Sequence, residues 1–403
     1  MSSYARSVKR LPERLAPRLG NLDIELTERC NNDCIHCCIN LPADDEVARV
    51  RETTAEQIKG ILTEAASLGC LRVRFTGGEP LLRHDFEELY LFARRLGMKV
   101  LLFTNATLIT PELADLFARI PPLARIESTA YGMSAESYEA VTRRPGSFSL
   151  FRRGVDLLLE RNVPFILKSA LLPPNRHEME AFEAWCATIP WMDKPPSYSL
   201  FFDLRNRRDD GAKNEQIAAM RLSPVEGLAV LARDEGRYRK TMQQFAQKFM
   251  APPGDRLLRC GAGRGLCIDA YGRVQPCMGV RAPELTVDAA ECTSSSPLAD
   301  ALKRFASLGE LRATNPAYLE RCANCFLKGL CEQCPAKSWS EHGALDTPVE
   351  YLCEVAHAQA HFLGWLKEGE KAWTVKQWRK RIAGNGRIQF AKEHEALSEV
   401  AGR

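Results

Sequence analysis

Short apolar runs alternate with helical patterns through the first half of the chain. The runs are typical of buried strands and lie at residues 22–26, 71–75, 98–104, 125–130, 163–171 and 198–204. Helical patterns lie between them; residues 58–66, for example, repeat apolar positions at helical spacing between Thr54 and Gly69. Strands that alternate with helices predict an α/β fold of parallel βαβ units. Right-handed crossovers can close such units into a barrel or leave an open sheet, and periodicity alone does not decide between the two.

The second half of the chain has a different pattern. Residues 206–255 are charged and then helical, which predicts a connector, and Arg205–Asp210 is typical of a solvated loop. Ala251–Gly254 marks a boundary, after which cysteines become frequent. We therefore expect an N-terminal arm at 1–20, an α/β domain at 21–205, the connector at 206–255, a cysteine-rich domain at 256–368 and a basic helical tail at 369–403.

Size, charge and cysteine content exclude several classes of protein. The 403 residues suffice for one large domain and a smaller one, and the hydrophobic fraction of 45% is ordinary for a globular protein. The net charge of +4 predicts no nucleic-acid footprint, no apolar run approaches a membrane span, and the N-terminus lacks the apolar core of a secretory signal. Fifteen cysteines in such a chain indicate metal rather than disulfides, and they predict a reducing cytoplasm with little oxygen.

Three cysteines follow the first predicted strand at C-x3-C-x2-C spacing, namely Cys30, Cys34 and Cys37. Thiolates are the usual ligands of iron–sulfur clusters, and a cubane cluster has four irons. Three local ligands therefore leave one iron open to a small chelating molecule. The alternatives are structural zinc, which usually takes four ligands in paired C-x2-C arms, and a disulfide, which suits small secreted chains.

This stretch resembles the radical S-adenosylmethionine (SAM) superfamily, whose motif is C-x3-C-x-aromatic-C, with His36 in the aromatic place. The resemblance implies a partial (β/α)6 TIM barrel with its site at the carboxyl edge of the strands. It also implies that the open iron binds SAM, and that the reduced cluster cleaves SAM to methionine and a 5'-deoxyadenosyl radical that abstracts a substrate hydrogen. We identify no catalytic side chain beyond the cluster.

Further stretches resemble SAM-binding positions of that superfamily. Thr76–Pro80 resembles the GGEP motif that holds the SAM amino group, and the residues so assigned are Gly77, Gly78, Glu79 and Pro80. Asn105 resembles part of a T-N turn after the third strand. Ser128 on the fourth strand, and Arg143 or equally Arg144, resemble residues that contact the SAM carboxylate. Each position is also compatible with an ordinary turn, cap or solvated strand end.

Eight cysteines of the second half form another pattern, centred on Cys322-x2-Cys325-x5-Cys331-x2-Cys334. Two C-x2-C pairs are also the pattern of a zinc ribbon. The arrangement resembles the SPASM extension of radical SAM enzymes, although the last short spacing there is x3 and here is x2. The resemblance implies two auxiliary clusters, and hence three [4Fe–4S] clusters in all. It assigns Cys260, Cys267, Cys277 and Cys334 to the nearer one and Cys322, Cys325, Cys331 and Cys353 to the farther one.

Other conspicuous residues have plainer interpretations. Asp269–Val274 predicts a small hairpin turning at Gly272. His357 and His361 lie four apart on a predicted helix but lack the glutamate of a zinc-protease motif. Four cysteines are left without a ligand role, of which the second and third are expected in the core and the last in an exposed loop: Cys38, Cys70, Cys186 and Cys292.

The resemblance implies radical chemistry without naming a substrate. Our leading hypothesis is modification of a peptide by crosslinking, epimerisation or oxidation; the alternatives are tailoring of a small molecule such as a haem precursor, and a non-enzymatic electron carrier. Met278 stands where sulfatase maturases carry an aspartate, which argues against sulfatase maturation. The expected partners are an electron donor of flavodoxin or ferredoxin type and, since about twenty residues before the first strand are too few for a leader-binding domain, a separate leader-binding protein.

Overall fold

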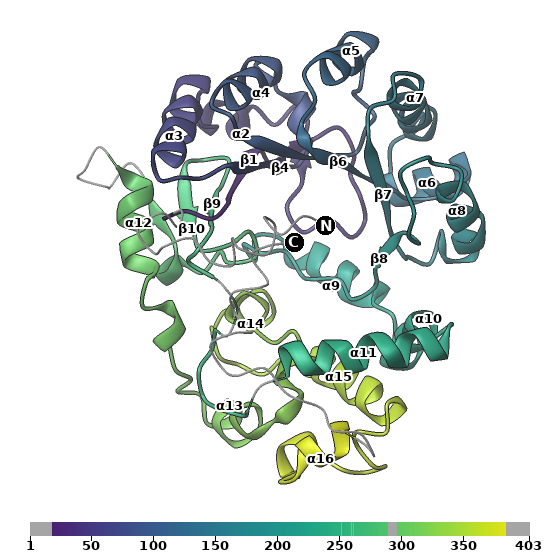
Figure 1. Cartoon of the computed structure of the whole chain (residues 1–403), viewed down its shortest axis with the longest axis vertical. Coiled ribbons are helices and arrows are strands. Elements are labelled where there is room, and N and C mark those ends of the chain that lie inside the picture. The colour runs from purple at the N-terminus through teal and green to yellow at the C-terminus, as the bar shows by residue number, and fades with distance from the viewer. Residues whose placement is uncertain (1–17, 251, 259, 261, 289–295, 384–403) are drawn as a thin grey trace, which may run out of the picture.

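A curved sheet of nine strands organises this computed structural model, which describes residues 18–250, 252–258, 260, 262–288 and 296–383. Six neighbouring strands are parallel and follow one another in the chain: β1 (Leu22–Thr27), β4 (Arg72–Gly77), β5 (Lys99–Thr104), β6 (Leu123–Ala130), β7 (Phe165–Ala170) and β8 (Ser197–Ser199). The arc that they draw in Figure 1 is the predicted partial barrel, and the α/β class is confirmed.

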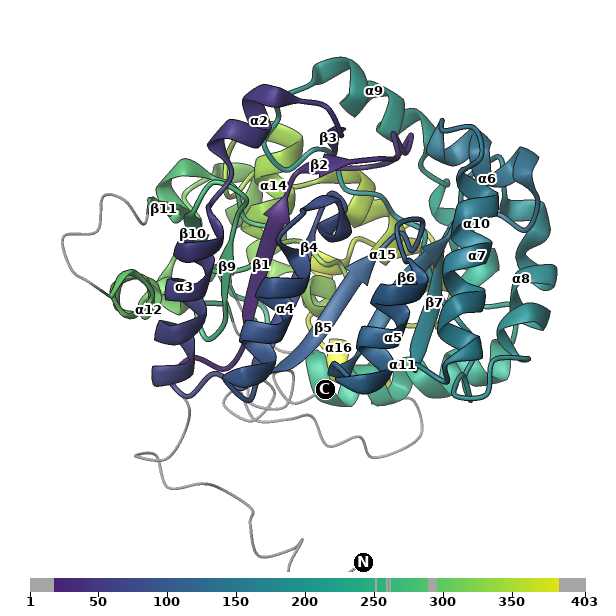
Figure 2. The same ribbon diagram turned by 90° about the horizontal axis from the view of Figure 1, so that it is seen from above.

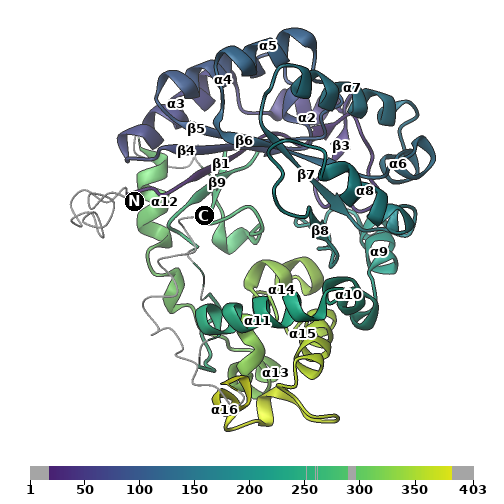
Figure 3. The same ribbon diagram turned by 45° about the vertical axis from the view of Figure 1, so that its right-hand side comes forward.

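Helices cover the convex face of this arc (Figures 1 and 3). They are α3 (Ala55–Ser67), α4 (Phe86–Arg95), α5 (Pro111–Arg119), α6 (Ala135–Thr142), α7 (Ser147–Glu160) and α8 (Met179–Cys186). A capping box between Thr54 and Gln57 begins α3, because each side chain accepts a hydrogen bond from the other residue's backbone N–H. Apolar positions at helical spacing, such as Ile58 and Leu62, then pack on the sheet and build the main core.

The sixth predicted strand is shorter than expected. The apolar run at 198–204 predicted a full strand, but β8 ends at Ser199 after three register pairs with β7. Leu200, Phe202 and Leu204 are buried in small side-chain clusters along an irregular segment. β8 is the last strand on this edge of the described sheet, so side-chain packing replaces the hydrogen-bonded ladder there.

The cysteine-rich half adds three strands to the opposite edge of the same sheet. β9 (Leu266–Ile268) pairs in parallel with β1, and β10 (Arg273–Gln275) and β11 (Val287–Asp288) follow in antiparallel order. The predicted hairpin is confirmed, because Gly272, with φ +83, turns the chain from β9 to β10. The sheet therefore continues across the expected boundary between the α/β domain and the cysteine-rich domain.

The rest of the second half is helical and lies across the concave side of the sheet, except for residues 297–305, which pack beside α3 (Figures 1 and 3). Its helices are α9 (Gly211–Met220), α10 (Pro224–Leu231), α11 (Glu235–Phe249), α12 (Pro297–Phe305), α13 (Pro316–Glu320), α14 (Pro335–His342), α15 (Glu350–Phe362) and α16 (Trp378–Ala383). A second core joins α11, α15 and α16 through residues such as Ala246, Ala360 and Trp378. Among the described residues, no helix combines the length and the apolar character that crossing a membrane requires.

Candidate cluster site at the carboxyl edge of the sheet

Residues 30–40, here called the cluster loop, leave the sheet at the carboxyl end of β1. The loop starts and finishes at a two-stranded ladder of β2 (Arg29–Cys30) and β3 (Leu41–Pro42), and α2 (Glu46–Arg51) follows it. Figure 2 shows this ladder, α2 and α9 gathered beyond the carboxyl ends of the barrel strands. The loop thus lies at the edge where parallel α/β folds place their sites.

The three thiols of the cluster loop interact with one another. Burial raises the pKa of Cys34 well above its usual value, and the neighbouring Cys37 and Cys30 raise it further. Burial and then the charge of Glu79 raise the pKa of Cys30 to about 12. In the described part of the chain, no three His, Cys, Asp or Glu side chains are close enough to hold one metal ion, whereas sulfurs on one tetrahedral zinc lie about 3.8 Å apart.

Asn105 connects the cluster loop to the barrel. Its side-chain amide donates to the Cys30 sulfur at 3.7 Å and to the Asn31 oxygen at 2.9 Å. Its oxygen accepts from the backbone and the hydroxyl of Thr107, and Thr107 in turn accepts from Asn31 at 2.8 Å. The predicted T-N turn after β5 is therefore in contact with the first cysteine of the motif.

The loop is also held by the end of α6. Backbone N–H groups of Asp33 and Ile35 donate to the carbonyls of Thr142 and Val141 at 2.9 and 3.0 Å. Arg143 adopts the left-handed conformation, with φ 51, and pairs with the Asp33 carboxylate at 2.5 Å. The structure thus directs Arg143 to the cluster loop itself, and Arg144 is exposed.

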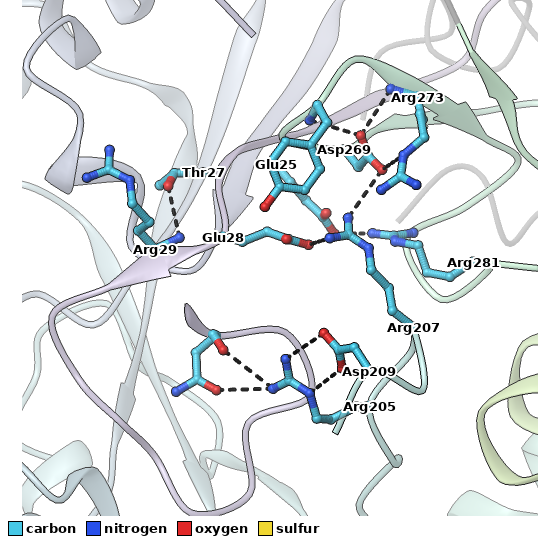
Figure 4. Close-up of polar contacts among 12 residues, drawn as sticks. Glu25, Thr27, Glu28, Arg29, Arg205, Arg207, Asp209, Asp269, Arg273 and Arg281 are labelled. Atoms are coloured by element: carbon cyan, nitrogen blue, oxygen red, sulfur yellow. Dashed lines mark hydrogen bonds and ion pairs between the residues drawn. The ribbon is translucent and has the colours of Figure 1, made fainter. Parts of the chain in front are cut away.

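The prediction of a solvated loop at Arg205–Asp210 holds for the exposed Arg208, Asp209 and Asp210 but was wrong for Arg205, which contacts the cluster loop. Arg205 is 5% exposed, pairs with Asp209 at 2.6 Å and reaches the Asn40 carbonyl at 3.4 Å (Figure 4). Lys213, the third residue of α9, is 8% exposed and donates to the Cys34 carbonyl at 2.9 Å. Arg205 is buried because it has acceptors in Asp209 and in the cluster loop, whereas Arg207 pairs with Glu28 and Asp269 outside that loop.

The two glycines after β4 are required by packing within the chain. A Cβ at Gly77, whose φ is +124, would lie 2.1 Å from the Thr27 carbonyl oxygen, and one at Gly78 would lie 2.3 Å from the Arg29 oxygen. Their backbones hydrogen-bond across this approach, from Gly78 N to Thr27 O at 2.7 Å and from Glu79 N to Arg29 O at 2.9 Å. The turn is therefore pressed against the start of the cluster loop.

Glu79 lies inside this turn and not at its surface. Its carboxylate is fully buried and accepts from Leu81 N at 3.0 Å, Thr104 Oγ1 at 2.8 Å and Asn105 N at 2.7 Å. Burial raises its pKa to about 7, although these three donors oppose the rise. Pro80 is buried beside it and opens the short 3-10 helix Pro80–Leu82. The carboxylate thus joins the turns after β4 and β5 and carries its charge just beneath them.

Two other predicted contacts are buried polar groups without a hydrogen-bond partner among the described residues. Ser128 is 3% exposed and lies level with Thr104 across β5 and β6; by alternation it shares the helix-covered face of Ile126. His36 packs its ring on Tyr131 and Phe202, with centroids 5.4 and 5.2 Å away, and burial lowers its pKa to about 4. His36 is therefore neutral and takes the apolar role of an aromatic residue.

Comparison with known families bears directly on this arrangement, because the family model for the Radical SAM superfamily matches residues 24–186. Residues 24–186 are a radical SAM domain. The matched range runs from β1 to the end of α8 and includes the cluster loop, the turn at Gly77–Pro80, Asn105, Ser128 and Arg143. The protein is accordingly a radical SAM enzyme.

Individual relatives of this radical SAM enzyme differ in what they are named for. It is 26% identical over 345 residues to an AdoMet-dependent heme synthase of Methanosarcina barkeri, covering 81% of this chain and 94% of the relative. It is 45% identical over 96 residues to a PqqA peptide cyclase of Streptomyces rochei, covering 24% and 26%. Among solved structures, anSMEcpe with bound AdoMet and Cp18Cys peptide aligns with a TM-score of 0.54 at 17% identity, covering 85% and 95%.

Four of the cysteines downstream of the radical SAM domain line one small pocket, namely Cys322, Cys325, Cys331 and Cys353. The Cys353 sulfur lies 3.7 Å from Arg321 Nη2 and 3.6 Å from His357 Nδ1. Arg321 also stacks on Trp373, 4.9 Å from the ring centroid. The set predicted for the farther cluster is thus brought together by η7 (Cys322–Asn324), η8 (Phe326–Gly329) and α15.

The set predicted for the nearer cluster lies at the junction of the sheet and α14. Cys267 is fully buried on β9, Cys277 follows β10, and Cys334 precedes α14. Burial is the largest cause of the raised pKa of Cys267, Cys277 and Cys334. The charge of Cys277 makes a smaller contribution to the raised pKa of Cys267 and Cys334, and the charge of Cys260 does the same for Cys277. Cys260, Cys267 and Cys334 are therefore each within electrostatic range of Cys277. Cys292 lies outside the described residues, and Cys70 and Cys186 are buried in the core, as expected.

A buried charge network between the radical SAM domain and the cysteine-rich region was missed from the sequence (Figure 4). Glu25 on β1 pairs with Arg281, and both side chains are 3% exposed. Arg207 joins Glu28 to Asp269, the latter at 3.2 Å. The available signal was the pair of acids Asp23 and Glu25 inside an otherwise apolar strand, since a buried acid needs a partner.

Proposed function

We propose that this radical SAM enzyme cleaves SAM reductively and abstracts a hydrogen atom from a substrate held in the barrel. One observation carries the proposal: Asn105 joins the Cys30 sulfur to the Glu79 carboxylate, so three separate sequence motifs meet at one edge of the sheet. When bound, a [4Fe–4S] cluster on Cys30, Cys34 and Cys37 supplies the electron that converts SAM to methionine and a 5'-deoxyadenosyl radical.

The chain's own residues hold this site in shape. Asn105 donates to Cys30, which favours its thiolate form, and Lys213 fixes the backbone at Cys34. His36 fills the space between Tyr131 and Phe202 and excludes water from the loop. These contacts set the three thiols before any ligand arrives.

SAM is held beside the loop by the turn at Gly77–Pro80. Because the Glu79 carboxylate is buried behind this turn, its negative charge favours an ammonium group in front of the turn without requiring direct contact. Ser128 and Arg143 remain proposed carboxylate contacts. The hydroxyl of Ser128 lies on the helix-covered face of β6, which does not support its assignment, and the pairing of Arg143 with Asp33 requires Arg143 to serve the loop and the ligand together.

The eight downstream cysteines hold two auxiliary [4Fe–4S] clusters, which makes the second region a SPASM domain. The shared pocket of Cys322, Cys325, Cys331 and Cys353 supports the farther cluster, and the mutual influence of the other four thiols supports the nearer one. Since every iron then has a cysteine, these clusters carry electrons and stabilise the region rather than bind substrate.

Two substrate classes have support. A peptide is supported by the local similarity to a PqqA peptide cyclase and by the fold shared with anSMEcpe, whose structure contains a bound peptide. Tailoring of a haem precursor is supported by a similarity to AdoMet-dependent heme synthase that spans 94% of that relative. An external electron donor of flavodoxin or ferredoxin type serves either reaction, and a separate leader-binding protein serves the first.

The test is anaerobic incubation of the reconstituted full chain with SAM and dithionite, followed by measurement of 5'-deoxyadenosine. A variant with Cys30, Cys34 and Cys37 changed together to Ala is the matched control and should form none. Mass spectrometry of reactions with candidate precursor peptides and with iron tetrapyrroles then separates the two substrate classes. Absence of 5'-deoxyadenosine from protein that carries its iron would refute the proposal and favour a non-enzymatic electron carrier.

A further inference from the structure

Charged side chains gather on the concave face of the sheet, directly beneath the cluster loop. On β5, Leu101, Phe103 and Asn105 alternate with core residues and therefore share this face. Phe103 lies two residues before Asn105, which corresponds to about 7 Å along a strand. Since Asn105 contacts the Cys30 sulfur, the ring of Phe103 is one layer below the reacting end of the site.

Two cations approach the ring of Phe103 from opposite sides of β5. Arg74 on β4 places its guanidinium carbon 4.9 Å from the ring centroid, and Lys168 on β7 places its ammonium nitrogen 4.8 Å away. Arg74 pairs with Asp23 on β1 at 3.3 Å, and Lys168 pairs with Glu127 on β6. Five strands thus contribute one residue each to a single cation–aromatic cluster.

The cations of this cluster are more exposed than the acids that pair with them. The side chains of Arg74 and Lys168 are 27% and 37% exposed, whereas those of Asp23 and Glu127 are 12% and 9% exposed. Arg125 adds a third cation, 3.3 Å from Glu127 and 53% exposed. Three cations against two acids give this face a positive potential, and burial further raises the pKa of Asp23. A ligand entering from the concave side therefore meets donors and positive charge.

Met278 closes one side of the cluster. Its sulfur lies 3.3 Å from Arg74 Nη1, so the segment after Cys277 reaches from the cysteine-rich region into the barrel. An uncharged side chain at this position does not compete with a ligand anion for Arg74.

From this geometry we propose that Arg74 and Lys168, set around Phe103, form a subsite for a carboxylate group of the substrate. This inference rests on the proposed function, which places the substrate in the barrel. It narrows the substrate class to molecules with a carboxylate near the hydrogen that is abstracted. The ring of Phe103 lies between the two cations, each of which is held by a buried acid, and Arg125 beside Glu127 leaves the face with an excess positive charge.

A matched pair of small probes tests the subsite without knowledge of the substrate. Fluorine NMR measures binding of 4-fluorobenzoate and of the uncharged 4-fluorobenzamide to the reconstituted full chain. We expect the benzoate to bind at least about tenfold more tightly, since a charge-assisted contact discriminates by that order. Equal affinities would overturn the proposal and leave the cluster as internal ion pairs only.

Variants then locate the binding. Lys168→Gln removes the more exposed cation and should abolish the preference for benzoate, whereas Lys168→Arg should keep it. Arg152→Gln is the control, because Arg152 stacks on Trp185 at 4.3 Å in the outer helical layer. A Lys168→Gln protein that retains the full preference would overturn the assignment. Formation of 5'-deoxyadenosine by the wild-type protein is measured separately, so failure of the proposed function and failure of the subsite are distinguishable.

Discussion

Glu79 makes the stability of the apo chain depend on pH in a direction that can be worked out. Burial raises its pKa from 4.5 to about 7, so the folded chain holds this proton more tightly than the unfolded chain does. The contribution of Glu79 to the free energy of unfolding is therefore largest below pH 4.5. This contribution declines as the pH rises to 7 and is constant above pH 7. Since one pKa unit corresponds to 1.36 kcal/mol, the decline is about 3 kcal/mol.

Glu79→Gln removes this titration at a known structural cost. The amide oxygen can keep the bonds from Leu81 N and Thr104 Oγ1, but the new NH2 then meets the N–H of Asn105. One buried donor without a partner costs about 1–3 kcal/mol. We expect the variant to be less stable than wild type at pH 5 by that amount, and to gain about 3 kcal/mol relative to wild type by pH 8.

Urea midpoints, followed by tryptophan fluorescence on reduced, metal-free protein at pH 5, 6, 7 and 8, measure the difference. Thr104→Val is the comparison variant: it removes a donor that lowers the pKa of Glu79, so its destabilisation should grow from pH 5 to pH 8, opposite to the trend of Glu79→Gln. The same negative charge favours binding of SAM. The affinity of the wild-type protein for SAM should therefore rise from pH 6 to pH 8 relative to the affinity of Glu79→Gln. Because SAM itself titrates equally in both measurements, the comparison cancels that effect. A difference in stability that is independent of pH would refute the reasoning about the buried carboxylate.

Four further predictions follow from the site. Anaerobic reconstitution should give about twelve irons per chain, and zinc in place of iron in anaerobically purified protein would contradict the cluster assignments. Gly77→Ala should prevent SAM cleavage because its Cβ would meet the Thr27 carbonyl, whereas Gly60→Ala, with nothing within 4 Å, should be neutral or stabilising by circular dichroism. Lys213→Met should lose iron to a chelator faster than Lys213→Arg does. Equal rates would show that the Lys213 contact does not hold the cluster loop in place. Cys277→Ala should still form 5'-deoxyadenosine but no oxidised product, provided that its iron content and fold are checked first; normal product would exclude the electron relay.

The elements that the sequence predicted well depend on local signals. Five of the six strands and the α3 capping box follow from residues a few positions apart, as does the turn at Gly272. The cysteine motif identified the position of the site for the same reason. The length of β8 was overestimated because an apolar run indicates burial but not strand pairing. Leu200 and Phe202 are buried by side-chain packing, without backbone pairing to another strand.

Long-range partners could not be predicted in this way. Lys213 contacts the carbonyl of Cys34 across 179 residues, and Arg281 pairs with Glu25 across 256. A charged run does not indicate which of its members find acceptors elsewhere, so Arg205 and its neighbours were assigned to solvent. The resemblance assigned Gly77 and Gly78 to SAM binding, but the sequence did not indicate that backbone atoms of Thr27 and Arg29 are their nearest neighbours.

The pairing of β9 with β1 makes the two halves of the chain inseparable. A truncated protein that stops before residue 256 would leave β1 as an open edge, with its row of backbone N–H and C=O groups unpaired and available to other chains. It would also leave Glu25 buried without Arg281. Fragments of the barrel alone are therefore expected to aggregate. Exchange of the cysteine-rich half between related enzymes would have to preserve the register of Leu266, Cys267 and Ile268 against Leu22, Asp23 and Ile24.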